Sequence, residues 1–265
     1  MPPTMEMISG HIANVATLTN LTTNTGDSLT VRSFDQSKKA WLLNTWAFVT
    51  AAGITEIHSP RMHDNVHSIR YRVAASQAQP LIPLGQPQRV YPVDTLTVQL
   101  AGDATAGRLQ PQSLLMYYED VPGLSARFMK PADVFSRCVN IYAVETTITL
   151  AVTGDYSAAV AINANFDQFI ANTDYALIGY VPDIATASIQ WRGADIGNVR
   201  VGGPGVNNLV HLTSEWFMRL SEELNLPLVP ILNSQNKGGI LLDALMSQAG
   251  GTLNVTSVLA QLRSS

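Results

Sequence analysis

The sequence predicts a mainly β protein with a few inserted helices, of the β-sandwich or jelly-roll type. Three observations support this prediction. Short runs of alternating apolar and polar residues recur along the 265 residues, turns rich in glycine or proline separate them, and long amphipathic segments are rare. A chain of 28.6 kDa can bury one large core or two cores of about 130 residues each.

The alternating runs place most of the expected strands. In the segment Asp94–Leu100, the side chains of Leu96, Val98 and Leu100 share one face of a strand. The last run, Leu253–Leu262, fits a strand, with a helix as the alternative. Strands are expected at residues 28–34, 54–58, 66–73, 94–100, 113–120, 145–152, 175–181, 187–191 and 253–262.

Helices are expected at fewer places. Asp35 can cap a helix in which Trp41, Leu42, Trp46 and Val49 lie on one face, which predicts a core stripe. Pro131 in a first turn and Thr213 as an N-cap indicate the starts of two other helices. The helices are expected at residues 35–49, 131–137 and 213–224, with shorter ones at 165–170 and 240–246.

The chain divides into an N-terminal arm and two β modules. Residues 1–26 are rich in threonine and asparagine and contain one charge, Glu6, so they are expected to form an extended arm. This arm is held by a neighbouring subunit or packs on its own domain. The modules are expected at residues 27–138 and 139–265, stacked on each other or merged into one continuous domain.

The chain carries little charge for its length. Only 14% of its residues are charged, against about 25% in an ordinary soluble domain, and 46% are hydrophobic. Because interface cores are depleted in charge, this composition indicates an assembly subunit. No apolar segment is long enough to span a bilayer, and no basic patch predicts direct nucleic-acid binding. The single Cys138 excludes an intrachain disulfide, and no signal peptide is expected.

Three histidines form the best metal candidate. His58, His63 and His67 lie within ten residues, with Asp64 available to orient a ligand. The preferred interpretation is a polar hairpin whose histidines bond to the backbone, so no metal is expected. The glycine-rich loop Gly193–Gly205 lacks the ending of a phosphate-binding loop, so its Asp195, Asn198 and Arg200 are expected to order the loop or contact a neighbour. No catalytic residue and no cofactor are expected.

Several features together indicate a class of protein. They are the arm Met1–Gly26 with its single charge, the alternating strands that end in Gly-Asp turns (Asp94–Asp103 and Thr146–Asp155), and the long loops Pro80–Pro92 and Gly193–Gly205. In these features the chain resembles the jelly-roll coat proteins of viruses, including bacteriophages. The resemblance implies a structural protein, not an enzyme, which assembles in the host cytoplasm into the virion. It would form a capsid shell or decorate one, through contacts of the arm and loops with copies of itself and with other virion proteins.

Two other functions fit the same composition. A phage tail or baseplate component, or another carbohydrate-binding β module, would need an exposed aromatic platform. Trp191, Tyr175 and Tyr180 are the candidates, although their alternation with apolar residues favours core packing. A metal-dependent enzyme would use the three histidines.

Overall fold

The computed structural model describes residues 3–13, 15–62, 68–78, 87–104, 109–151, 153–246 and 250–263. Within them the chain is mainly β, with four antiparallel sheets and few helices, which confirms the predicted fold class. The strands of the first half are β1 (Thr4–Ile12), β2 (Thr19–Asn20), β3 (Thr22–Thr23), β4 (Ala40–Ala47), β5 (Gly53–His58), β6 (Ile69–Val73), β7 (Gln88–Val90), β8 (Thr97–Ala101) and β9 (Gln110–Tyr118). The elements of the second half are β10 (Phe128–Met129), α1 (Pro131–Arg137), β11 (Cys138–Thr149), β12 (Val160–Ala161), β13 (Asp174–Pro182), β14 (Ser188–Arg192), β15 (Val201–Pro204), α2 (Val210–Thr213), α3 (Trp216–Leu224), β16 (Val229–Asn233), the 3-10 helix η1 (Ser234–Gly239), β17 (Leu241–Leu245) and β18 (Thr252–Leu262).

The strands of the first half form a jelly roll. One sheet has the order β3-β1-β9-β4-β7 and the other has the order β2-β8-β5-β6. Without the short β3, eight strands remain, and they can be numbered 1 to 8 along the chain. Their order across the sheets is then 1-8-3-6 in one sheet and 2-7-4-5 in the other. This is the strand order of two interlocked Greek keys, in which nearly every connection crosses between the two sheets. We call this unit the first roll.

The strands of the second half repeat the same order. Its sheets are β10-β16-β13-β18-β11 and β12-β17-β14-β15. When β10 is set aside, β11 takes the position of β1, and β18 takes that of β9, and the other strands correspond in turn. We call this unit the second roll. It begins with β11 at Cys138, although β10 also pairs within its sheet. The division of the chain into two folding units at this point stays a prediction.

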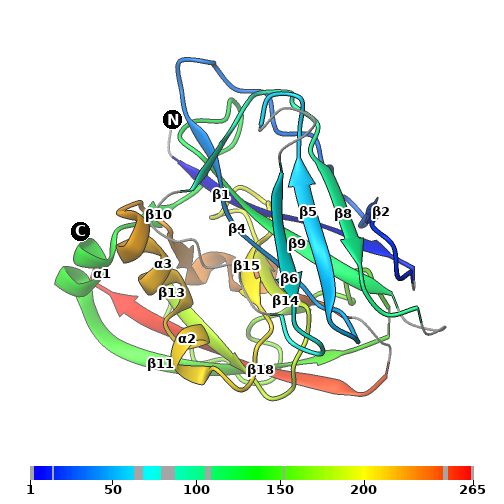
Figure 1. The fold of residues 1–265 in the computed structure, drawn as a ribbon. Helices are drawn as coiled ribbons and strands as arrows, with labels where there is room; N and C mark the ends of the chain where they lie inside the picture. Colours follow the sequence, from blue (N-terminus) through cyan, green and yellow to red (C-terminus); the bar gives the residue numbers. More distant parts are fainter. Residues whose placement is uncertain are drawn as a thin grey trace.

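The rolls are stacked head to tail, so the sheets form four successive layers (Figure 1). The β1-containing sheet of the first roll lies on the β14-containing sheet of the second roll. Trp46 on β4 donates from its indole Nε1 to Ser188 Oγ on β14 at 3.0 Å, and Ser113 on β9 contacts the same hydroxyl at 2.6 Å. The amide of Met7 on β1 donates to the carbonyl of Arg200 at 2.7 Å.

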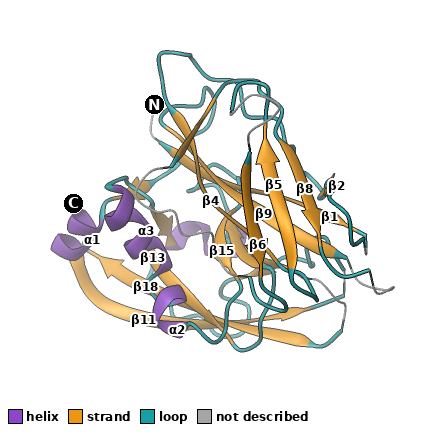
Figure 2. Ribbon diagram, in the orientation of Figure 1, coloured by secondary structure: helices purple, strands orange, loops and turns teal. Residues whose placement is uncertain are grey.

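Helices cover the far end of this stack (Figure 2). On the outer face of the β11-containing sheet, Val134 of α1 and Met218 of α3 pack against Ala260 and Ile231. Gly179 of β13 lies where the end of α2 crosses the strand, and a Cβ at this position would approach the carbonyl oxygen of Thr213 to 2.3 Å. Glycine is therefore required for α2 to pack so closely on the sheet. Among the described residues, no helix is long and apolar enough to cross a membrane.

Residues 4–12, expected to lie in an extended arm, instead form the buried strand β1. This strand pairs along its whole length with β9, from Thr4 opposite Tyr118 to Ile12 opposite Gln110. Met5 and Met7 are buried against the second roll, and Ile8 packs into the core of the first roll. The sequence lacks charge in this region because both faces of the strand are covered. Of the two alternatives for the arm, residues 4–12 therefore follow the second and pack on their own chain.

The expected helix at residues 35–49 is also wrong. Residues 40–47 form β4, which is paired with β7 and β9 and has a β-bulge between Leu42 and Asn44. Both faces of β4 are buried, so apolar residues occur on both and obscure the alternation typical of a strand. Two smaller expectations fail: Leu241–Leu245 is strand β17, and residues 165–170 contain no helix.

Other expected elements are found with shifted ends. The helix at residues 131–137 is confirmed, and the one at 213–224 is split into α2 and α3. Strands are present at the expected places except 28–34, which makes only an isolated bridge between Thr30 and Thr95. Residues 66–67 of the expected strand 66–73 lie outside the described residues, as do residues 80–86 of the loop Pro80–Pro92. The loop Gly193–Gly205 ends in strand β15.

We predict that Met7→Ala destabilises the fold by about 2–5 kcal/mol, because it opens a cavity between the rolls. Thr17→Ala, at an exposed position between β1 and β2, is the matched control and should change stability by at most about 0.5 kcal/mol. Urea unfolding followed by tryptophan fluorescence measures both changes. Equal and small effects would show that β1 is not part of the core.

Candidate functional site

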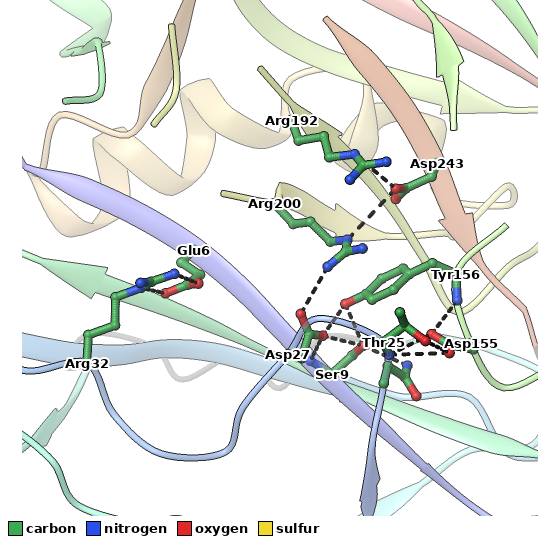
Figure 3. Close-up of polar contacts among 11 residues, drawn as sticks. Glu6, Ser9, Thr25, Asp27, Arg32, Asp155, Tyr156, Arg192, Arg200 and Asp243 are labelled. Carbon is green, nitrogen blue, oxygen red and sulfur yellow. Dashed lines mark hydrogen bonds and ion pairs between the residues drawn. The ribbon is translucent and has the colours of Figure 1, made fainter. Parts of the chain in front are cut away.

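A largely buried cluster of polar side chains lies where the two rolls meet (Figure 3). Its centre is Arg200, just before β15, whose guanidinium lies between two carboxylates. Arg200 Nη1 is 3.1 Å from Asp27 Oδ1, and Nε is 3.8 Å from Asp243 Oδ2. Asp27 comes from the first roll and Asp243 from β17 of the second, and Arg192 on β14 also approaches Asp243 Oδ2 at 3.7 Å. We call these residues, with Tyr156 and Ser9, the inter-roll network.

Asp27 is held by several donors at once. The backbone amide of Ser9 donates to its Oδ2 at 2.7 Å, and Ser9 Oγ lies 3.0 Å from the same oxygen. The Tyr156 hydroxyl, from the segment between β11 and β12, also donates to Asp27 and accepts from Ser9 Oγ at 2.6 Å. The Arg200 guanidinium stacks on the Tyr156 ring, 3.7 Å from its centroid. Charge-assisted bonds and a cation–π contact therefore join residues distant in sequence.

A second contact lies beside the network. The carboxylate of Asp155 accepts from the backbone amide of Thr25 at 3.1 Å and also from the Thr25 hydroxyl. His11 Nδ1 contacts Asn24 Oδ1 at 2.6 Å. Hydrogen bonds from Thr25 oppose the effect of partial burial and lower the pKa of Asp155. The segment 24–27 of the first roll is thus fixed to the segment 155–156 of the second.

Burial controls the acidity of the network. Removal from water raises the pKa of Asp27, although Tyr156, Arg200 and Ser9 oppose this effect. Burial also raises the pKa of Tyr156 well above its usual value. Burial raises the pKa of Asp243 to about 6, against the opposing charges of Arg200 and Arg192. Within the described residues, Asp243 Oδ1 and the Nε atoms of Arg192 and Arg200 are buried without a hydrogen bond. The ion pairs of the two arginines with Asp243, at 3.7 and 3.8 Å, are longer than hydrogen bonds.

The network is suited to joining the rolls. Asp27 is already engaged by Arg200 and by donors of Ser9 and Tyr156, whereas Asp243 forms only longer ion pairs. A buried carboxylate bonded as Asp27 is fixes one relative position of the elements around it. In the part of the chain that the structure describes, no three His, Cys, Asp or Glu side chains are grouped so as to hold a metal ion.

Of the three histidines proposed as metal ligands, only His58 is described. It lies on β5, with its Nδ1 3.7 Å from Glu56 Oε1. His63 and His67, with Asp64, lie outside the described residues, so the expectation that these histidines hold no metal stays a prediction.

The aromatic candidates for sugar stacking are buried. Tyr175, Tyr180 and Trp191 are each at most 1% exposed and belong to the core of the second roll. The Tyr180 and Trp191 rings lie 5.1 Å apart, and Tyr180 donates to the carbonyl of Pro204 at 2.9 Å. Core packing, the preferred interpretation of these residues, is confirmed.

The charged residues of the loop Gly193–Gly205 have structural partners. Asp195 accepts from the Asn233 amide at 2.8 Å and lies 4.0 Å from Arg127, and Arg200 belongs to the inter-roll network. Their expected role in ordering the loop is thus supported. Asp27, Tyr156 and Asp243 were not found from the sequence. The one available signal is Asp243 itself, a lone carboxylate within the apolar run Leu241–Leu245.

The fold defines the chain as a tandem jelly-roll β protein. No family model matches it, and no curated protein matches it significantly. Among solved structures, it is similar to the PBSX exported protein XepA, with 10% sequence identity and a TM-score of 0.23, over 94% of this chain and 86% of that chain. A similarity at this level carries no argument about function, so the strand order of the chain itself supports the class.

We predict that Arg200→Ala destabilises the protein by about 3–5 kcal/mol, because it leaves two buried carboxylates without their shared cation. Arg219→Ala is the matched control. It removes an exposed i,i+4 pair, in which Nη2 lies 3.0 Å from Glu215 Oε2, and should cost at most about 0.5 kcal/mol. Chemical denaturation measures both. Similar costs for the two variants would contradict a structural role for the network.

We predict that Asp243 makes the protein less stable as pH rises from about 4 to about 6. Its pKa is about 6 in the folded chain, against 3.8 in the unfolded chain, so in this window only the folded state retains the proton. The loss is at most about 3 kcal/mol at 1.36 kcal/mol per pKa unit. In Asp243→Asn this part of the pH dependence should be absent. Denaturation at several pH values tests it, and an unchanged slope in the variant would overturn the assignment.

Proposed function

We propose that this chain is a structural protein of a virion, which assembles with copies of itself into a capsid shell or onto one. The observation that carries the proposal is the outer surface of the two rolls. Several large apolar side chains are exposed there, and only 14% of the residues in the chain are charged. The most exposed are Phe135 at 67%, Phe166 at 66% and Val93 at 66%. A surface that is poor in charge and carries apolar side chains supports contact with a partner.

The architecture supports the same proposal. Jelly rolls occur in viral capsid proteins and in lectins, so the fold alone selects neither. All four tryptophans lie in described residues: Trp46, Trp191 and Trp216 are buried and Trp41 is partly buried. The buried charges of the inter-roll network are used within the chain, which leaves contact between molecules as the function that the surface supports. In this proposal the protein works by contact and not by catalysis.

The rigid stack suits a shell subunit. The buried contact between the rolls gives one fixed relative placement, and a shell requires each subunit to present its surfaces at constant angles. Interfaces of standard size bury about 1,600 Å² in total, and a subunit in a shell forms several of them.

We predict that the purified chain self-associates as its concentration is raised. Light scattering coupled to size-exclusion chromatography, with electron microscopy of the larger species, measures this. Because the surface is poor in charge, association should persist when NaCl is raised from about 0.1 M to about 0.5 M, where pairs of exposed charges are screened. A chain that stays monomeric at the highest soluble concentration would overturn the proposal.

A further inference from the structure

The long strand β11 has an unpaired outer edge. It forms the end of its sheet, and along its twelve residues it pairs with β18 on one side only. Within the described residues no other strand pairs with it. An open edge presents a row of backbone N–H and C=O groups to any strand that approaches. Figure 1 shows β11 as a long strand along the lower border of the second roll, at the outside of the molecule.

The equivalent strand of the first roll is covered. The outer edge of β1 pairs with β3 at Gly10 and His11. Further along the same strand, the Ser9 carbonyl accepts from the amide of Asn24, the Ser9 amide donates to Asp27, and the Met7 amide donates to the carbonyl of Arg200. The same topological position is therefore closed in one roll and open in the other.

The open edge lacks the usual protection against pairing. Proteins block long edges with lysines, prolines, bulges or short strands. Over Cys138–Thr149 the only charged residue is Glu145, there is no proline, and the single bulge lies at one end, between Cys138 and Asn140. Two apolar side chains near that end are exposed, Val139 at 45% and Ile141 at 58%. Phe135, on the helix that leads into the strand, is exposed at 67%.

We propose that the edge of β11 binds the same edge of a second copy of this chain, as an antiparallel pair about a two-fold axis close to Ile141. This inference rests on the proposed function and names its first interface. The two sheets then continue across the contact as one, by strand addition. A two-fold contact uses the same patch on both copies, so each substitution changes the interface at two places.

Charge complementarity identifies the second copy as the partner. With the axis close to Ile141, the exposed residues Val139, Ile141 and Ala143 of the two copies meet one another. Glu145 of each copy then reaches the end of the other strand, where Arg137 lies. Within the described residues Glu145 forms no ion pair, and Arg137, the last residue of α1, has no carboxylate within ion-pair distance. Arg137 donates to the backbone carbonyl of Arg263, just beyond β18, at 2.9 Å, so its guanidinium reaches Glu145 of the second copy only when this bond is released. Opposite charges across strands stabilise such a pair, and like charges weaken it.

The experiment measures the dissociation constant of the pair by sedimentation velocity for the full chain and its variants. Ile141→Lys places a charge in the apolar centre of the contact and should weaken pairing by about tenfold or more. Val93→Lys is the matched control, because Val93 is 66% exposed but belongs to the first roll. It should leave pairing unchanged. Thermal unfolding verifies that both variants are folded.

A charge exchange tests the arrangement of the strands. Arg137→Glu and Glu145→Arg should each weaken pairing by about threefold or more, because each creates two repulsive contacts. The double variant restores opposite charges and should pair within about threefold of the original chain. A double variant that pairs no better than the single ones would overturn the axis close to Ile141.

The outcomes separate this inference from the proposed function. If the original chain assembles and Ile141→Lys assembles equally well, the edge of β11 is not the interface, and the proposed function stands. If the original chain stays monomeric at all concentrations, both are overturned. If Ile141→Lys and Val93→Lys weaken pairing equally, a general effect of added charge replaces the edge contact.

Discussion

The arrangement of the whole molecule depends on one shared cation. Arg200 lies between a carboxylate of the first roll, Asp27, and one of the second roll, Asp243. Each roll has its own apolar interior, but the layer between them is partly polar: Ser113 and Ser188 are buried there, and the Arg200 side chain is only 15% exposed. Apolar contact, such as that of Met5 and Met7, brings the two sheets together without direction. The charged pairs and hydrogen bonds are directional, and they select one placement of roll upon roll.

The same stacking explains which parts of the fold could be predicted from sequence. Strands with one face toward solvent kept their alternation, as β8 shows with its buried Val98 and Leu100. Strands that lie between the two rolls show no such alternation. In β1 and β4 almost every side chain is buried, so a period of two residues disappears from the apolar pattern. The segments that appeared as an arm and as a helix are therefore those that hold the two rolls together.

The inter-roll network was beyond the reach of sequence reasoning for a related reason. Its members lie far apart in the chain, with no common spacing, and only the crossing connections of two jelly rolls bring them together. Arg200 was noticed because it lies in a glycine-rich loop, but its partners could not be inferred. The exposed edge of β11 was hidden as well. Its alternation was visible, whereas its place at the end of a sheet depends on the order of all the strands.

Head-to-tail stacking has a consequence for how far such a chain could grow. Opposite sides of a roll meet in this contact, so nothing in its geometry closes it, and a third roll could in principle be added at either end. At one end α1 and α3 cover part of the sheet face on which a third roll would pack. Val134 and Met218 occupy the space that side chains of the third roll would fill. These helices act as a terminal cap, as end repeats do in solenoid proteins, and limit the column to two units at that end.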